Sequence, residues 1–588
     1  MILQALTSLY EALAPKGEVP KEGWSREKIS FALGIDENGD LLRITPLFKP
    51  GDMPKGKKKE EPQEMTVPAA VKRTSGAAAN FLWDNSSYIL GVSLKKGEDD
   101  AEREKRRNKD IKCFEACREL HHSMLDGMEY PAAKAVLNFL DKWEPQKAEE
   151  NNLVAQYAKE ILSGANMVFR FNGGYVHDDP QLASVWQKAN AKQKDNIGQC
   201  LVTGALDEIQ KTHPTIKGVQ GAQSSGAALV SFNASAFCSY NKEQNQNAPV
   251  GKYAAFAYTT ALNHLLADRK NVHRIGDAAV VCWAENADKQ YEDFAAEVFF
   301  GDNVDKSDEQ RLSALRTSLK LLADGLPCKE MDLDPDRKFY ILGLSPNAAR
   351  LAVRFFYCDS FGKIAGNIYK HHERLEIVRP SYDKFPILPL WKLLSATVNP
   401  NAKDKTPNAA MAGAVARAVF SGGRYPASLL ECTFLRIKAE RNITRERAAI
   451  IKAYYLRNPN EKCPKEVLTV SLNENSKNIP YTLGRLFSVY EEIQQAANPG
   501  INTTIKDRYF GSAAAMLATV FPILSNLAQK HLRKLSDAQR VYLDKKVMTL
   551  KSVLGEQYPA HMSLPEQGSF DLGYYHQTQA RYTKKEDK

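Results

Sequence analysis

Residues 29–47, ISFALGIDENGDLLRITPL, are the stretch that most directly predicts how this chain folds. Apolar and polar residues alternate on both sides of Glu37-Asn38-Gly39-Asp40, and such alternation around an Asn-Gly pair is typical of two strands joined by a tight turn. Further predicted strands, separated by helices, are the apolar runs MVFRF (167–171), ALVSF (228–232), AVVCW (279–283) and FYILGLS (339–345). The first four hundred residues are therefore expected to be α+β.

Helical patterns lie at the start of the chain and after residue 400. Leu3, Leu6, Leu9 and Leu13 form one apolar stripe, which predicts a short amphipathic helix at the start of the sequence. From about Thr406 the segments have helical periodicity with little strand pattern. We therefore expect three parts: an α+β region over 1–400, a basic helical segment over 401–466 and a C-terminal helical bundle over 467–588.

Length and composition indicate a large globular protein. A chain of 588 residues exceeds what one hydrophobic core usually supports, and 43% hydrophobic residues argue against wholesale disorder. The net charge of +10 suits a polyanionic partner without requiring one. Nine cysteines are scattered without a CxxC pair, which fits a reducing cytoplasm, and no apolar run of about twenty residues predicts a membrane span.

Two groups of residues contain side chains that can bind metal ions, and each group has its own interpretation. Cys113, Cys117 and His121 lie at i, i+4 and i+8 of one helix face, and we expect them to pack in a core, because such a ladder puts its third residue too far along the helix. His177 and Asp178, joined by an upstream His121 or His122, would suit a metal-dependent phosphohydrolase of the HD type. Metal-dependent nuclease activity of the isolated chain would distinguish this alternative.

The common catalytic signatures are absent from the sequence. It contains no GxxxxGK[ST] phosphate loop, no GxSxG and no HExxH. We therefore expect neither a cofactor nor a resident metal.

Residues 239–251, SYNKEQNQNAPVG, are rich in side-chain amides. Each amide carries donors and an acceptor that must be satisfied when water leaves, so the segment is unsuited to a core. It is either a solvated loop, because Asn, Gly and Pro are ordinary turn residues, or a surface that recognises something polar.

A second polar feature is a run of basic residues at helical spacing. Positive charge is only lightly diluted by Glu440 and Glu446 along this run, which comprises Arg436, Lys438, Arg441, Arg445, Arg447, Lys452 and Arg457. A solvated helix face remains possible, but neutralisation of a nucleic-acid backbone is the better account for a stripe of this length.

Segments along the whole chain resemble the large subunit of the type I-C Cascade, an RNA-guided CRISPR surveillance complex. The resemblance is carried, in order, by VKRTSGAAANFLWDNSSYILG (71–91), ALVSFNASAFCSYNKEQNQNAPVGKYAAFAYTTALNHLL (228–266), FYILGLSPNAARLAVRFFY (339–357), RYPASLLECTFLRI (424–437), IKDRYFGSAAAMLATVFPILSNLAQKHLRKL (505–535) and LGYYHQTQ (572–579). None of these segments is a catalytic fingerprint.

The resemblance implies a non-catalytic role in cytoplasmic antiviral defence. Such a subunit lies near the 5′ handle of the guide RNA, recognises the protospacer-adjacent motif in double-stranded DNA and starts strand separation for R-loop formation. Its partners would be the guide RNA, the target duplex with its displaced strand, the Cascade backbone and small subunits, and a nuclease-helicase. The resemblance also implies that a product resembling the small subunit is made from an internal start near Val467.

If the chain has this role, its polar segments are expected to contact nucleic acid. A thymine-rich motif shows only acceptors in the minor groove, so its recognition needs donors. The residues expected at the motif are Phe232, Asn233, Ser235, Ser239, Asn241, Lys242, Gln244, Asn245, Gln246, Asn247 and Lys252. Lys72, Arg73 and Thr74 are a second candidate DNA or RNA-handle site, and the basic run would hold the displaced strand. A guide-RNA scaffold without DNA recognition is a further alternative.

Overall fold

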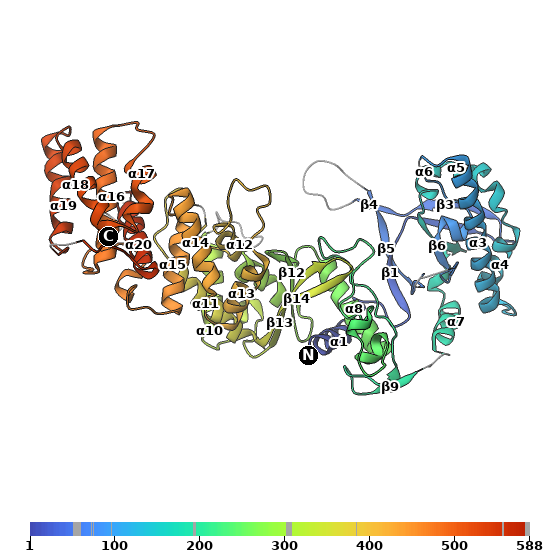
Figure 1. The fold of residues 1–588 in the computed structure, drawn as a ribbon. Helices are drawn as coiled ribbons and strands as arrows, with labels where there is room; N and C mark the ends of the chain where they lie inside the picture. The colour runs from blue at the N-terminus through green and yellow to red at the C-terminus, as the bar shows by residue number, and fades with distance from the viewer. Residues whose placement is uncertain are drawn as a thin grey trace. The chain divides into compact units, whose positions relative to one another are not determined.

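The computed structural model describes residues 1–50, 60–71, 73, 76–95, 97–191, 196–301, 309–383, 385–555 and 558–582. The chain forms two compact units. The N-terminal unit comprises Tyr10–Thr212 and Phe232–Thr260, and the C-terminal unit comprises Met1–Leu9, His213–Ser231 and Ala261–Lys588. Strands and helices are mixed in the first four hundred residues, and the elements described after them are helices, which confirms the α+β class (Figure 1).

The predicted hairpin forms the edge of the main sheet of the N-terminal unit. β2 (Phe31–Ile35) and β3 (Leu41–Pro46) pair antiparallel, and Gly39 adopts the positive φ of +82° that the turn requires. The sheet has the order β3-β2-β7-β6, with β8 attached to β7. Its other strands are β6 (Trp83–Asn85), β7 (Asn166–Phe171) and β8 (Gly174–Tyr175), so the predicted strand at 167–171 is confirmed.

The central strands of this sheet are buried on both faces. Phe31 and Leu33 of β2 point into one hydrophobic core, while Ala32 contributes to a second core on the opposite face. Because neither face meets water, β2 is apolar at every position except Gly34. The helices of this unit are α2 (Ser86–Ile89), α3 (Asp100–Leu125), α4 (Pro131–Lys142), α5 (Asn152–Ala155), α6 (Ala158–Ile161) and α7 (Pro180–Ala191).

Two smaller sheets complete the N-terminal unit. One has the order β1-β5-β4, with β1 (Trp24–Ile29), β4 (Phe48–Pro50) and β5 (Glu60–Pro68), and Figure 1 shows β1 and β5 as a long antiparallel pair. The other pairs β9 (Ile197–Gln199) with β10 (Leu206–Glu208). α1 (Ile2–Leu13), the predicted first helix, and α8 (Lys252–Ala267) each contribute residues to both units.

The sheet of the C-terminal unit is an antiparallel meander. It consists of β11 (His273–Ile275), β12 (Ala278–Ala284), β13 (Lys338–Asn347) and β14 (Arg350–Ser360), which confirms the predicted strands AVVCW and FYILGLS. The prediction of a strand at 228–232 is wrong. Ala228 makes one isolated bridge to Arg350 of β14, and the chain then bends at Leu229 and Val230, so no ladder follows.

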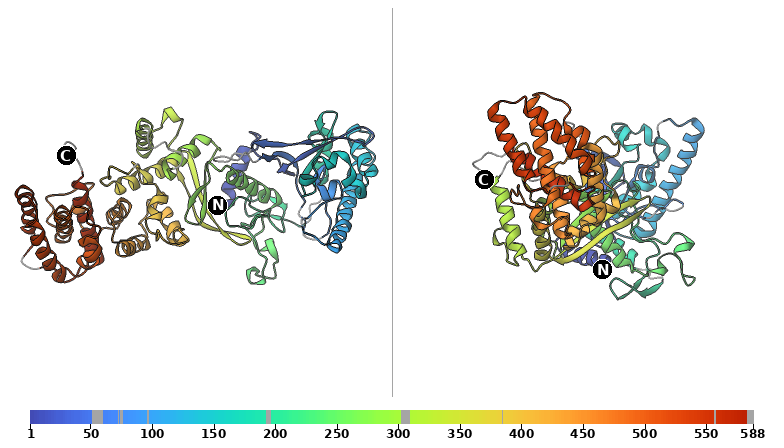
Figure 2. Two further views of the ribbon diagram at one scale, coloured as in Figure 1. Left: turned by 90° about the horizontal axis from the view of Figure 1, so that it is seen from above. Right: turned by 60° about the vertical axis from the view of Figure 1, so that its left-hand side comes forward.

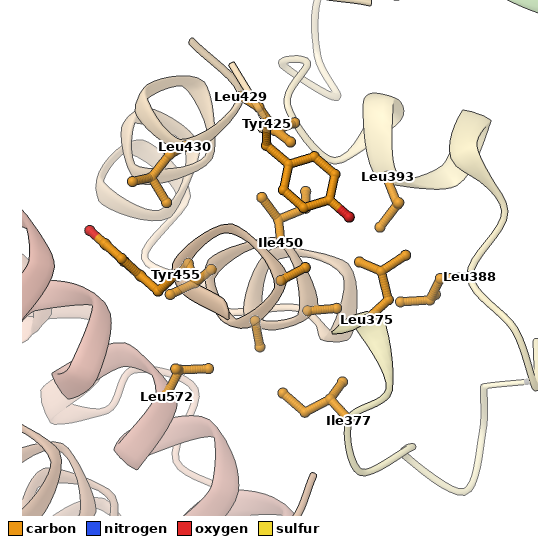
Figure 3. Packing of buried hydrophobic residues seen from close by; sticks show 14 of the residues in the cluster. Leu375, Ile377, Leu388, Leu393, Tyr425, Leu429, Leu430, Ile450, Tyr455 and Leu572 are labelled. Atoms are coloured by element: carbon orange, nitrogen blue, oxygen red, sulfur yellow. The ribbon is translucent and has the colours of Figure 1, made fainter. Parts of the chain in front are cut away.

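Helices surround one continuous hydrophobic core in the C-terminal unit. It runs from Ile275 in β11 to Tyr575 in the last helix. Figure 3 shows part of it, with labelled side chains from residues 375–393, 425–430 and 450–455 gathered around one interior. The helices are α9 (Lys289–Ala295), α10 (Glu309–Ala323), α11 (Phe361–Leu375), α12 (Leu390–Ser395), α13 (Ala409–Ser421), α14 (Ala427–Glu440), α15 (Arg445–Arg457), α16 (Ile479–Ala497), α17 (Ile505–Ala513), α18 (Leu517–Leu532), α19 (Asp537–Lys551) and α20 (Leu564–Ala580).

Two of these helices, α16 and α20, approach each other unusually closely. A Cβ atom on Gly484 of α16 would overlap the carbonyl oxygen of Phe570, and a Cβ on Gly573 of α20 would overlap that of Tyr481. The red helices stand together in both views of Figure 2. Within the described part of the chain, no helix is long and apolar enough to cross a membrane.

Candidate nucleic-acid interface

The amide-rich loop lies in the N-terminal unit, between a short 3-10 turn at Ser235–Phe237 and the start of α8, and it contains a second 3-10 turn at Gln244–Asn247. Its conformation depends on the side chain of Asn247. The Ser239 N–H donates to Asn247 Oδ1 at 2.9 Å, and Asn247 Nδ2 donates to the carbonyl oxygens of Lys242 at 3.0 Å and Gln244 at 2.9 Å. One amide therefore fixes three backbone positions of the loop.

Two more of the amides also hold the loop, Asn245 from a buried position and Gln246 from an exposed one. Asn245 is buried, and its Nδ2 donates to the carbonyl oxygen of Gln210 at 2.7 Å. Gln246 and Glu243 form a capping box around the short turn at 244–247. The sequence predicts that Asn245, Gln246 and Asn247 face DNA. The Nδ2 groups of Asn245 and Asn247 instead hold the loop, whereas Gln246 is exposed and uses its Oε1 in the capping box.

The remaining predicted loop residues are available on the surface to different degrees. Lys252 lies 3.9 Å from Glu208, at the limit of an ion pair, and Phe232 is half-buried. The exposed members are Asn233, Ser235, Ser239, Asn241, Lys242 and Gln244. Among them Asn241, Lys242 and Gln244 offer donors beside one another, at the tip that Asn247 holds.

One residue of this tip is absent from the residues predicted to recognise DNA. Tyr240 is 94% exposed and has a positive φ of 53°. The sequence contained an indication of it, because an aromatic residue in the middle of a polar loop has no core to enter. The prediction rested on the amides and left out the ring beside them.

The second predicted site is described only in part. Lys72 and Thr74 lie outside the described residues. Arg73 contacts the buried carboxylate of Asp84, donates from Nε to the carbonyl oxygen of Ala78 at 2.7 Å, and lies 3.9 Å above the ring of Tyr88. These contacts tie the segment at 73–84 together, so Arg73 has a structural role here.

The basic run from 436 to 457 does not form one stripe. It is divided between α14 and α15, and the chain reverses between them at Arg441, whose φ is +51°. Arg441 is exposed and donates to the carbonyl oxygen of Asp507. Lys438 is also exposed, whereas Arg436 lies near Glu440 and Arg457 donates to the carbonyl oxygens of Gly422 and Gly423.

The middle of this run is buried and engaged by the protein. Arg445 donates to Asp383 Oδ2 at 3.0 Å and to the carbonyl oxygen of Pro386 at 3.1 Å. Arg447 donates to Glu440 Oε2 at 2.6 Å and to the carbonyl oxygen of Ala396 at 3.2 Å. Both guanidinium groups therefore anchor loops, and their charge is neutralised where water is excluded.

Lys452 is the third buried cation of the run. Its Nζ donates to the carbonyl oxygens of Glu373 at 3.4 Å and Arg374 at 3.1 Å, at the C-terminal end of α11, where a helix presents unsatisfied carbonyls and partial negative charge. Burial lowers the pKa of Lys452 to about 8. This lysine caps a helix within the core.

Two histidines of the alternative phosphohydrolase site, His177 and His121, are buried. His177 is buried, with Nε2 3.6 Å from an oxygen of the exposed Asp178, and burial lowers the pKa of His177. His121 accepts from the Leu82 N–H at 2.9 Å and contacts the carbonyl oxygen of Cys117 at 2.7 Å, and burial lowers its pKa to about 4.

His122, the other candidate partner, lies between Asp126 at 2.8 Å and Asp141 at 2.9 Å, and these hydrogen bonds raise its pKa. No three His, Cys, Asp or Glu side chains among the described residues are arranged to hold a metal ion. Cys113, Cys117 and His121 pack in the core, as predicted.

Comparison with known proteins agrees with the resemblance seen in the sequence. A family model described as CRISPR-associated protein (Cas_Csd1) matches residues 6–582. No curated protein matches the chain. Because the family model spans nearly all of both compact units, the chain belongs to the Csd1 family of CRISPR-associated proteins.

Proposed function

We propose that this chain is the large subunit of a type I-C Cascade and recognises the protospacer-adjacent motif in double-stranded DNA. The observation that supports this role best is the tip of the amide-rich loop, where Asn241, Lys242 and Gln244 are exposed on a backbone fixed by Asn247. Family membership supplies the setting, a CRISPR complex with other Cas proteins and nucleic acids.

A fixed loop suits the recognition of a short motif. In the minor groove an A·T-rich sequence presents acceptors only, and amide NH₂ groups and an ammonium are donors that fit them. A loop that is already ordered loses little conformational entropy on binding, so more of each contact appears as affinity. The three amides that hold the loop thus contribute to recognition indirectly, by presenting the three exposed donors.

The remainder of the role follows from how RNA-guided complexes divide the work. Base pairing with the guide reads the sequence, and the protein reads only the short motif and the shape of the strands. We infer that the chain binds near the 5′ handle of the guide RNA, contacts the backbone and small subunits, promotes R-loop formation and offers a surface to the nuclease-helicase, without catalysis of its own. The exposed Lys438 and Arg441 are the members of the basic run proposed to contact the displaced strand.

The experiment uses the assembled complex and two duplexes that differ only in the motif. Asn241 and Gln244 have φ values of 55° and 44°, so Asn241→Gly and Gln244→Gly remove their side chains without straining the backbone. Combined with Lys242→Ala, these changes should cost about 1–3 kcal/mol for each base that is no longer recognised, measured as a weaker preference for the motif duplex.

The matched control is Lys188→Ala, which removes an exposed lysine from α7 of the same unit. It should leave the preference for the motif unchanged. If the triple variant discriminates between the two duplexes as well as the unmodified complex does, the loop does not read the motif. A wild-type complex that binds both duplexes equally would favour the guide-RNA scaffold, and metal-dependent cleavage by the isolated chain would favour the phosphohydrolase.

A further inference from the structure

Tyr240 is the most exposed aromatic side chain in the described part of the chain, at 94%. An isolated exposed apolar group needs no explanation by itself. Tyr240 differs from that ordinary case in its backbone, in the way its loop is held, and in the polar character of its neighbours.

The backbone at Tyr240 is in a conformation that bulky residues avoid. Tyr240 and Asn241 have consecutive φ values of 53° and 55°, and the Lys242 N–H donates to the carbonyl oxygen of Ser239 at 3.0 Å. Positive φ at both central residues defines a type I′ turn, whose first central position normally holds Asn, Asp or Gly. A tyrosine there costs about 1 kcal/mol or more, and strain of this kind collects at functional sites.

The turn is held on both sides by the same side chain. Asn247 accepts from the backbone of Ser239 before the ring and donates to the backbone of Lys242 after it. The ring therefore projects from a fixed base. A residue that is strained, exposed and held in place is suited to meeting a partner without rearrangement.

The neighbours of Tyr240 favour a single flat partner. The exposed residues next to it in the turn are polar: Ser239, Asn241, Lys242, Glu243 and Gln244. The nearest other exposed ring is that of Phe237, which is 47% exposed. A protein partner would need an apolar centre of several side chains, and two separate rings in a polar loop do not make one. One ring beside an ammonium and an amide instead matches a nucleobase and its phosphate, through stacking and through charge.

We propose that Tyr240 stacks on the base pair next to the motif and keeps it unstacked, so that strand separation starts there. The inference rests on the proposed function, because the loop must first be positioned at the motif. Stacking of a base on an aromatic side chain contributes about 1–3 kcal/mol, which offsets part of the few kcal/mol that unstacking costs.

The test compares Tyr240→Ala and Tyr240→Phe in the assembled complex. The duplex carries the motif and a 2-aminopurine at the adjacent pair, whose fluorescence rises when the base unstacks. We expect the Phe variant to keep the rise, because the ring suffices, and the Ala variant to lose it and to form the R-loop about 5- to 150-fold more slowly. A duplex mismatched at that pair should restore the rate of the Ala variant.

The control is Tyr382→Ala, which removes another largely exposed tyrosine, from the C-terminal unit, and should change neither signal. Equal opening by the Ala variant and the wild type would overturn the proposal, and so would loss of a subunit from the Ala complex, since the ring would then dock a protein. In both of these outcomes the wild-type complex still prefers the motif duplex, so the proposed function stands. If the proposed function is wrong, the wild-type complex instead binds the motif and motif-free duplexes equally.

Discussion

At the scale of single residues, the sequence showed which chemistry is present but not where it points. Asn247 and Asn241 are both asparagines of one loop, yet Asn247 braces the backbone and Asn241 is exposed. Arg445 and Arg441 are both arginines of one run, yet only Arg441 is exposed. Side-chain amides and guanidinium groups bind backbone carbonyls as readily as nucleic acid, and the choice depends on contacts between residues far apart in the chain.

The buried Lys452 gives a prediction about pH. Its folded-state pKa of about 8 lies below the ordinary lysine value near 10.4, so between these values the unfolded chain holds more protons. Stability contributed at this position therefore rises with pH across that window, by at most about 1.4 kcal/mol per pH unit. Relative to Lys452→Met, the wild type should gain thermal stability between pH 8 and pH 10.

Differential scanning calorimetry of both proteins at the two pH values measures this difference. Lys438→Met, at an exposed lysine of the preceding helix, is the matched control and should show the same change with pH as the wild type. A constant gap between the wild type and Lys452→Met would mean that Lys452 remains charged throughout.

At the scale of elements, local sequence patterns were sufficient to predict an element whose contacts lie within it or with its neighbour in the chain. The hairpin at 31–46 and the helices after 406 followed from alternation, turn chemistry and helical periodicity. ALVSF failed because a strand requires a partner, and its local sequence is no guide to whether β14 pairs beyond one bridge. The glycines of α16 and α20 likewise predict nothing from their local sequence, because each is required by the close approach of the other helix.

The glycine crossing predicts a strong response to one methyl group. Gly484→Ala or Gly573→Ala places a Cβ against a backbone carbonyl, which the neighbouring helix can accommodate only by moving. Such overpacking costs about 1–3 kcal/mol or more. Both variants should lower the melting temperature of the C-terminal unit in thermal unfolding followed by circular dichroism.

Gly511→Ala supplies the control, because Gly511 lies in α17 with no atom near its Cβ position and no positive φ. There the substitution should be neutral or stabilise by up to about 1 kcal/mol, since alanine favours the helix. A similar result for all three variants would contradict the close crossing.

At the scale of the whole molecule, the sequence predicts that residues 467–588 form a helical bundle with a core of their own. In the structure their core continues into α15: a Cβ on Gly568 of α20 would lie 2.9 Å from the ring of Tyr455, and the Tyr575 hydroxyl donates to the carbonyl oxygen of Val378 at 2.8 Å. Figure 3 shows Leu572 of α20 next to Tyr455. A fragment lacking α15 would expose this apolar surface.

Two fragments test this expectation. Residues 441–588, which retain α15, should unfold roughly 5 °C or more above residues 467–588, because the α15 face of α20 is no longer buried in the shorter one. Both should be helical, and the shorter one should self-associate at high concentration. Equal melting temperatures would show that the bundle is stable without α15. A product started near Val467 would then not need α15 to cover the apolar face of α20.

The meeting of α16 with α20 also has a consequence for biosynthesis. Tyr574 of α20 donates a hydrogen bond to Glu491 of α16, and these residues are 83 positions apart in the chain. The ribosome therefore completes α16 on the order of ten seconds before α20 has been synthesised. During this interval the glycine-containing face of α16 has nothing to cover it. The nascent chain therefore carries an unfinished core that chaperones would have to shield, and a message cut short before α20 would leave that face permanently bare.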